Sequence, residues 1–189
     1  MSRCRVSGSG RWDRNRDADP RRRRTSRLGE WPDAAHRFHA HHAAAPKARR
    51  LEVAVTVVVR DGAGRLLLIR AVDTDHYSIP GGIHEVGETI FEAAVRDVAE
   101  RTGVVVKVTG LVGVYSDPRH AITVGKGEIR QEFSVCFRAT PTSGEPAESV
   151  ESAAAVWVDP ADLRHLTIHP SVRLRIAHGL TDRAEPFFT

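Results

Sequence analysis

Cysteine is scarce in this chain, and apolar runs of membrane-spanning length are absent from it. The two cysteines among 189 residues, Cys4 and Cys136, lie far apart in sequence, so neither a disulfide framework nor a cysteine-based zinc site is implied. No apolar segment follows the N-terminal arginines, as one would in a secretory signal. These absences favour a protein of the reducing cytoplasm, and the length suits one domain with a sizeable core.

Charge is distributed unevenly along the chain. Residues 1–50 contain 14 Lys or Arg against 5 Asp or Glu, a net of +9, whereas the remainder contains 14 against 19, a net of −5. Residues 1–48 also lack hydrophobic periodicity, and they hold too few apolar side chains to offset the entropy of ordering. We therefore predict a disordered basic tail there. It could tether the protein to nucleic acid or another anionic surface, but a solvated extension is the simpler interpretation, and nucleic acid is not an expected partner.

Residues 49–182 are expected to form the ordered domain, with a short C-terminal tail at 183–189. A β-branched strand at 51–60 and a partner strand at 65–71 are predicted to form a hairpin around the turn at 61–64. The other predicted elements are strands at 104–115, 131–138 and 153–158, helices at 89–101, 160–166 and 170–180, and loops at 116–127 and 141–148. Strands around one amphipathic helix, with helices at the end, predict a mixed α/β sandwich.

The stretch from Gly82 to Val104 contains the densest array of ionisable side chains. Its predicted helix carries charged residues at i, i+4 steps on one face, with Asp97 beside them. These charged residues are Glu88, Glu92, Arg96 and Glu100. Such an array can present carboxylate oxygens to a hard divalent cation. Glu92 also has a simpler role, because Thr89 to Glu92 reads as a helix capping box.

This stretch resembles the signature of the Nudix hydrolases, G-x5-E-x7-R-E-U-x-E-E-x-G-U, where U is a bulky apolar residue. The matching positions are Gly82, Glu88, Arg96, Val98, Glu100, Gly103 and Val104. The resemblance covers about residues 51–180. It implies an α/β/α sandwich with a mixed sheet and a strand–loop–helix catalytic segment. It also implies metal-dependent hydrolysis, by water, of a pyrophosphate bond in a nucleoside diphosphate linked to another moiety, with Mg²⁺ or Mn²⁺ as the Lewis acid.

The resemblance also implies roles for residues of the signature. Glu100 would be a metal ligand, and the carbonyl of Gly81 a second ligand. Asp97 would be a ligand or would position the attacking water. Arg96 and Glu88 would pair and brace the loop against the helix. A homodimer is plausible on the same grounds.

Outside the signature, the candidates for substrate contact are weaker. Arg119 and His120 fall in a loop where the family often contacts phosphate or base. The candidates for a further glutamate are, in order, Glu148, Glu151 and Glu132. Each of these side chains could equally be an ordinary solvated surface residue. Pro118 hints at an ADP-ribose-like substrate, although turn chemistry explains a proline there as well.

The chain departs from the signature at Asp97 and Arg101. Asp97 is one methylene shorter than glutamate, a loss of roughly 1.5 Å in reach. Arg101 replaces a carboxylate with a cation; within about 6 Å of a divalent ion, at an effective dielectric of ~20, the repulsion is on the order of 5 kcal/mol. We expect Arg101 to turn to water or to pair with Asp97, metal affinity to be weakened, and Glu92 or Glu85 to substitute. The alternative is a Nudix-fold nucleotide-binding sensor with weak or no turnover.

Overall fold

The computed structural model describes residues 37–40, 48–72, 75–118, 120–124, 128–150 and 152–189. Most of the predicted disordered tail therefore lies outside the described residues. Within the predicted tail, however, residues 37–40 form a strand, which pairs with a strand from the predicted loop at 116–127.

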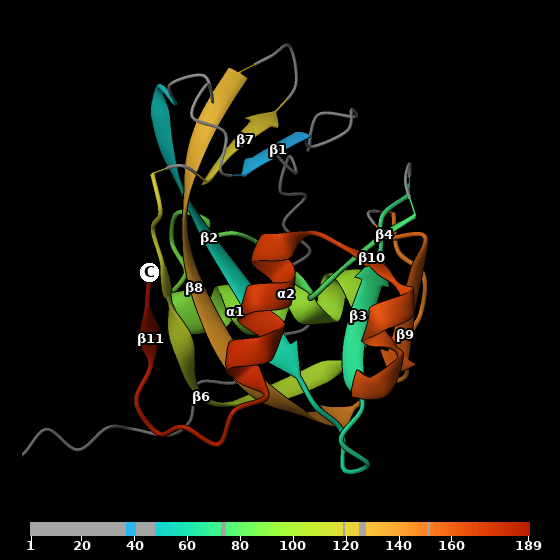
Figure 1. The fold of residues 1–189 in the computed structure, drawn as a ribbon. Coiled ribbons are helices and arrows are strands. Elements are labelled where there is room, and N and C mark those ends of the chain that lie inside the picture. Colours follow the sequence, from blue (N-terminus) through green and yellow to red (C-terminus); the bar gives the residue numbers. More distant parts are fainter. Residues whose placement is uncertain (1–36, 41–47, 73–74, 119, 125–127, 151) are drawn as a thin grey trace, which may run out of the picture. The chain divides into compact units, whose positions relative to one another are not determined.

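Within the described ranges the strands form two β-sheets, and the larger has seven strands (Figure 1). They are β1 (Arg37–Ala40), β2 (Arg50–Val59), β5 (Gly81–Ile83), β6 (Val105–Tyr115), β7 (His120–Val124), β8 (Glu128–Ser143) and β11 (Phe187–Phe188). The order β1-β7-β8-β2-β5 forms its path, and β6 joins β8 and β11. Because β2 and β8 pair in parallel while most other strands pair antiparallel, the sheet is mixed, as expected.

The smaller sheet shows that the predicted hairpin is wrong. Its order is β10-β4-β3-β9, with β3 (Leu66–Arg70), β4 (His76–Ser78), β9 (Ala154–Val158) and β10 (Thr167–Ile168). The turn at Asp61 forms, but β2 and β3 are joined by a single bridge, between Arg60 and Leu66, before they enter different sheets. The reason is burial: Leu66, Leu67 and Leu68 are all fully buried, so both faces of β3 need cover.

The two α-helices cover opposite faces of the seven-stranded sheet. The helices are α1 (Ile90–Thr102), the 3-10 helix η1 (Pro160–His165) and α2 (Pro170–Gly179). The Phe137 ring of β8 lies 4.9 Å from the Phe91 ring of α1, whereas Arg138 donates to the carbonyls of His178 and Gly179 at the end of α2. Since adjacent strand residues point to opposite faces, the layers are α/β/α, which confirms the predicted fold class (Figure 1). No helix in the described ranges is long and apolar enough to cross a membrane.

Several smaller predictions about the elements are corrected. The predicted loop at 116–127 contains β7, and β8 continues into the predicted loop at 141–148. The predicted helix at 160–166 is a 3-10 helix. Strands β10 and β11 span two residues each and depend on pairing with β4 and β6, so no local pattern predicts them.

Helix α1 begins and ends where its sequence predicts. The backbone nitrogen of Glu92 donates to Thr89 Oγ1 at 3.2 Å, and that of Thr89 donates to Glu92 Oε2 at 2.7 Å, which completes the capping box. Gly103 ends the helix in the left-handed conformation, with φ of 74°. The buried side of the helix includes Asp97, while Ile90 and Val95 are only half-buried. The helix thus turns an acidic side chain toward the sheet.

Replacing Thr89 by alanine should lower the free energy of unfolding by about 1 kcal/mol, because one backbone donor of the first turn loses its acceptor. Urea unfolding monitored by circular dichroism measures this change. Thr109→Ala is the matched control, since Thr109 is exposed on β6. Equal losses in both variants would contradict a capping role for Thr89.

Candidate active site

Arg96 of α1 joins the helix to the loop that precedes it. Its Nε donates to Glu88 Oε2 at 2.9 Å and its Nη2 to Glu88 Oε1 at 2.7 Å. Nη2 also donates to the carbonyl of Ile83 in β5, at 3.2 Å. These hydrogen bonds from Arg96 hold the pKa of Glu88 below its usual range. The predicted Arg96–Glu88 pair is present, and it fixes strand, loop and helix relative to one another.

The remaining nitrogen of this guanidinium, Nη1, faces other carboxylates. It donates to Asp97 Oδ1 at 2.8 Å and to Glu100 Oε2 at 3.3 Å, and it lies 4.0 Å from Glu85 Oε1. Glu85 comes from the loop, while Asp97 and Glu100 come from successive turns of α1. Arg96 therefore gathers three carboxylates around one cationic nitrogen.

Asp97 is the most unusual of these carboxylates. It is 4% exposed, and its Oδ2 has no hydrogen-bond partner in the described part of the chain. Burial raises the pKa of Asp97 to about 6, although Arg96 and Arg101 both act to lower it. A buried carboxylate with one oxygen unsatisfied is a costly arrangement that a bound cation would relieve.

Gly82 leaves the space in which the Asp97 carboxylate lies. A Cβ added at Gly82 would lie 2.6 Å from Asp97 Oδ1 and 2.7 Å from Oδ2. Gly81, whose carbonyl is the predicted second ligand, pairs with Thr56 of β2 at the adjacent position of β5. Strand β5 thus places the backbone of both glycines beside the acidic face of α1.

Gly82→Ala should displace the Asp97 carboxylate and reduce turnover by on the order of 10-fold, because small misplacements in a reacting site are costly. Steady-state kinetics on a hydrolysed nucleotide substrate measures the effect. Gly62→Ala is the matched control, since a Cβ there meets nothing within 4 Å. Full turnover in the Gly82 variant would show that the close approach of Gly82 to Asp97 has no part in the reaction.

The other predicted contacts are spread over the fold. His120 opens β7, and its ring lies 5.9 Å from that of His169, the N-cap residue of α2. Glu148 is exposed and follows a loop tied to the end of α1, where the backbone nitrogen of Ala147 donates to the carbonyl of Thr102. Arg119 and Glu151 lie outside the described residues. His120 thus lies beside the N-cap residue of α2, and Glu148 lies near the C-terminal end of α1.

Glu132 is held on the other face of the sheet from α1. Its Oε1 accepts from Arg175 Nη2 of α2 at 2.6 Å, and both side chains are largely buried. The Arg175 guanidinium also lies 4.9 Å from the Tyr115 ring. The alternating pattern of β8 places Glu132 on the α2 face, but its partner could not be predicted because α2 is distant in sequence. This ion pair makes Glu132 a structural residue.

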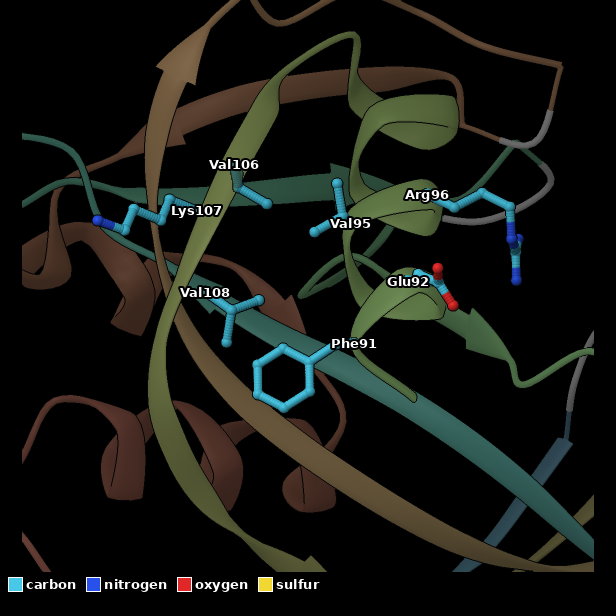
Figure 2. A pocket seen from close by; sticks show the side chains of 7 residues that line it. All are labelled: Phe91, Glu92, Val95, Arg96, Val106, Lys107 and Val108. Carbon is cyan, nitrogen blue, oxygen red and sulfur yellow. The ribbon is translucent and has the colours of Figure 1, made fainter. Parts of the chain in front are cut away.

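An apolar hollow of about 560 Å³ lies between α1 and β6, separate from these carboxylates. Figure 2 shows Phe91, Val95, Val106 and Val108 turned toward this hollow, while the charged ends of Glu92 and Arg96 extend away from it. None of its lining residues is Glu88, Asp97 or Glu100. The carboxylates of Glu85, Asp97 and Glu100 around Arg96 form an acidic cluster outside this hollow.

The carboxylates suit a divalent cation in their chemistry. Among the described residues, no three His, Cys, Asp or Glu side chains already stand in a metal-holding arrangement. However, the donors are oxygens, as Mg²⁺ and Mn²⁺ prefer, and Oδ2 of Asp97 is buried without a hydrogen-bond partner in the described ranges. Glu85 and Glu100 are more than half exposed, so their side chains can reorient toward a bound ion.

Comparison with known proteins identifies the family. The chain matches the NUDIX domain over residues 50–178. A MutT-like protein from Streptomyces ambofaciens is 36% identical over 121 residues, 64% of this chain and 71% of that protein. An ADP-ribose pyrophosphatase from Methanocaldococcus jannaschii is 52% identical over 42 residues, which span 22% of this chain and only 25% of that relative. The crystal structure of a MutT protein from Bacillus halodurans shares the fold, with a TM-score of 0.59 at 24% identity over 72% of this chain and 86% of that one. This chain therefore belongs to the Nudix hydrolases and is a Nudix-type pyrophosphohydrolase.

Proposed function

We infer that the chain hydrolyses the pyrophosphate bond of a nucleoside diphosphate linked to another moiety, in a reaction that depends on Mg²⁺ or Mn²⁺. The observation that carries this proposal is the buried Asp97 carboxylate, which has an unsatisfied oxygen and lies within the acidic cluster around Arg96. An ADP-ribose-like compound is the first candidate substrate. Pro118 and the short match to the archaeal ADP-ribose pyrophosphatase support this choice.

Asp97, Glu100 and the carbonyl of Gly81 would hold the cation. When bound, it supplies Lewis-acid chemistry, neutralising pyrophosphate charge and lowering the pKa of water. Glu88 and Arg96 keep the loop and the helix in register, so the carboxylates stay in place during the reaction. In the metal-free protein burial raises the pKa of Asp97 to about 6, so its carboxylate is largely ionised at neutral pH and available to a cation or to the attacking water.

The remaining proposals concern the substrate and the setting of the enzyme. Arg119, His120, Glu148 and Glu151 remain candidates for contact with the nucleotide. A reducing cytoplasm suits the chain, because its one described cysteine, Cys136, is buried and free. A homodimer is compatible with the proposal, and a nucleic-acid partner is not part of it.

A nucleotide sensor with little turnover is the second candidate, and Arg101 is the observation that favours it. Arg101 attracts the Asp97 carboxylate electrostatically and so competes with a cation for it. In such a protein the fold would bind nucleotide, while the metal would be held too weakly for efficient hydrolysis.

A substrate screen separates the two candidates. The full chain is incubated with ADP-ribose, other nucleoside diphosphate derivatives and nucleoside triphosphates, each with Mg²⁺ or Mn²⁺, and the released phosphate groups are quantified. We expect turnover of a nucleoside diphosphate derivative and a fall of about 100-fold or more in Glu100→Gln. Undiminished turnover in Glu100→Gln would refute the site, and nucleotide binding without turnover would favour the sensor.

A further inference from the structure

The acidic cluster is one carboxylate short of the signature, because Arg101 occupies the position of the second glutamate of the signature's Glu-Glu pair. That leaves Asp97 and Glu100 as the only carboxylates that α1 contributes around Arg96 Nη1. Mg²⁺ usually keeps several waters and takes one or two protein carboxylates, but a neighbouring arginine raises the negative charge that the site needs. A replacement would have to come from another element close to the same nitrogen.

Glu85 is the described residue that meets this requirement. Its Oε1 lies 4.0 Å from Arg96 Nη1, the nitrogen that Asp97 and Glu100 also face. The backbone nitrogen of Glu85 donates to Glu88 Oε1 at 2.8 Å, so the loop holds the backbone of Glu85 firmly. The side chain itself is 57% exposed and is therefore able to reorient without disturbing the core.

Two other glutamates, Glu92 and Glu132, have partners of their own. Oε2 of Glu92 accepts from both the backbone nitrogen and Oγ1 of Thr89, at 2.7 and 2.9 Å. Glu132 is paired with Arg175 on the opposite face of the sheet. From the sequence, Glu92 and Glu85 are equal candidates to replace the missing carboxylate. Because Glu92 is engaged in the capping box, Glu85 is the better candidate.

We propose that Glu85 supplies the carboxylate that Arg101 does not, and that Glu85, Asp97 and Glu100 together hold the divalent cation. The proposal rests on the function proposed above. Independent support for a bound cation comes from Asp97. This residue is buried, and its Oδ2 has no hydrogen-bond partner in the described ranges. A cation here competes with Arg96 only at Nη1, because Nε and Nη2 remain bound to Glu88. The Arg96–Glu88 pair therefore survives metal binding.

Binding of Mn²⁺ tests the proposal without any turnover. The dissociation constant is measured on the full chain by electron paramagnetic resonance of free Mn²⁺, for the wild type and for Glu85→Gln, Glu92→Gln and Asp97→Asn. We expect Glu85→Gln to weaken Mn²⁺ binding by about 10-fold or more. Glu92→Gln is the matched control: it removes the same charge nearby, and glutamine still completes a capping box, so its affinity should stay within about twofold of wild type.

The outcomes distinguish this inference from the proposed function. If Asp97→Asn weakens Mn²⁺ binding while Glu85→Gln and Glu92→Gln behave alike, Glu85 is not a ligand, but the metal site stands. If Asp97→Asn leaves Mn²⁺ binding unchanged, the metal site itself is refuted. Adding Arg101→Glu to Glu85→Gln should restore most of the lost affinity, and no recovery would contradict the exchange of one carboxylate for the other.

Discussion

The substitution Asp97→Asn is expected to reduce turnover by about 100-fold or more. It should also raise the free energy of unfolding of the metal-free protein at neutral pH. Turnover falls because the amide cannot replace the buried carboxylate as a ligand or as a group that orients water. Stability rises because the fold holds Asp97 buried, with Oδ2 unsatisfied, at a cost that asparagine does not incur. Opposite effects of one substitution on turnover and on stability are typical of a site residue that is kept for activity at a cost in stability.

The stability gain should depend on pH in a defined window. The pKa of Asp97 is about 6 in the fold against 3.8 as the reference, so between these values the folded state binds the proton more tightly than the unfolded state. Wild-type stability therefore falls as pH rises through this window, by up to about 3 kcal/mol. The advantage of Asp97→Asn should be present at pH 7 and should vanish near pH 4.

Urea unfolding in the presence of a chelator, at pH 4 and at pH 7, measures this difference. Glu100→Gln is the control, because Glu100 is more than half exposed and should show a much smaller change. A lower stability of Asp97→Asn at pH 7 would mean that the charged carboxylate, paired with Arg96, is a net stabilising group.

Arg96→Met is expected to lower the free energy of unfolding by about 3–5 kcal/mol, since it leaves buried carboxylates without their cation. The side chains of Glu88 and Asp97 are only 15% and 6% exposed, and both accept hydrogen bonds from Arg96. Methionine fills similar space, so the loss reflects the missing charge and hydrogen bonds rather than a cavity. Chemical denaturation at neutral pH, with the slope compared between variants, measures it.

Arg70→Met is the matched control for Arg96→Met. Arg70 lies 3.5 Å from Asp75, but the two side chains are 36% and 93% exposed, so this surface pair should contribute at most about 1 kcal/mol. A loss for Arg96→Met no greater than that for Arg70→Met would show that Arg96 does not brace the loop against α1.

The sequence predicts the local structure around the candidate site well where neighbouring residues decide it. The ends of α1 depend on Thr89, Glu92 and Gly103, which act within a few residues of one another. The spacing of Glu88 and Arg96 likewise follows from the loop and two helical turns, and the two side chains pair as expected. Glycines inside a strand are typical of bulges, and the register of β6 shifts beside both Gly110 and Gly113.

The features that the sequence does not predict depend on contacts between distant segments. The separation of β2 and β3 into two sheets follows from burial on both faces of β3, and β7 forms because it pairs with β1 and β8. The burial of Asp97 depends on how α1 packs against β5, where Gly82 leaves room for it. Reasoning from hydrophobic periodicity places acidic residues on the exposed side of a helix, so it fails for a carboxylate that is buried as Asp97 is.

Removing the divalent metal and adding it back tests most directly whether hydrolysis depends on a metal at the carboxylates around Arg96. The wild-type protein is freed of divalent ions with a chelator, and turnover of the substrate found in the screen is followed as Mg²⁺ is added back. We predict no turnover without metal and a saturable recovery with Mg²⁺, which Asp97→Asn should fail to show. Undiminished turnover in the chelator would contradict a metal-dependent reaction at the carboxylates around Arg96.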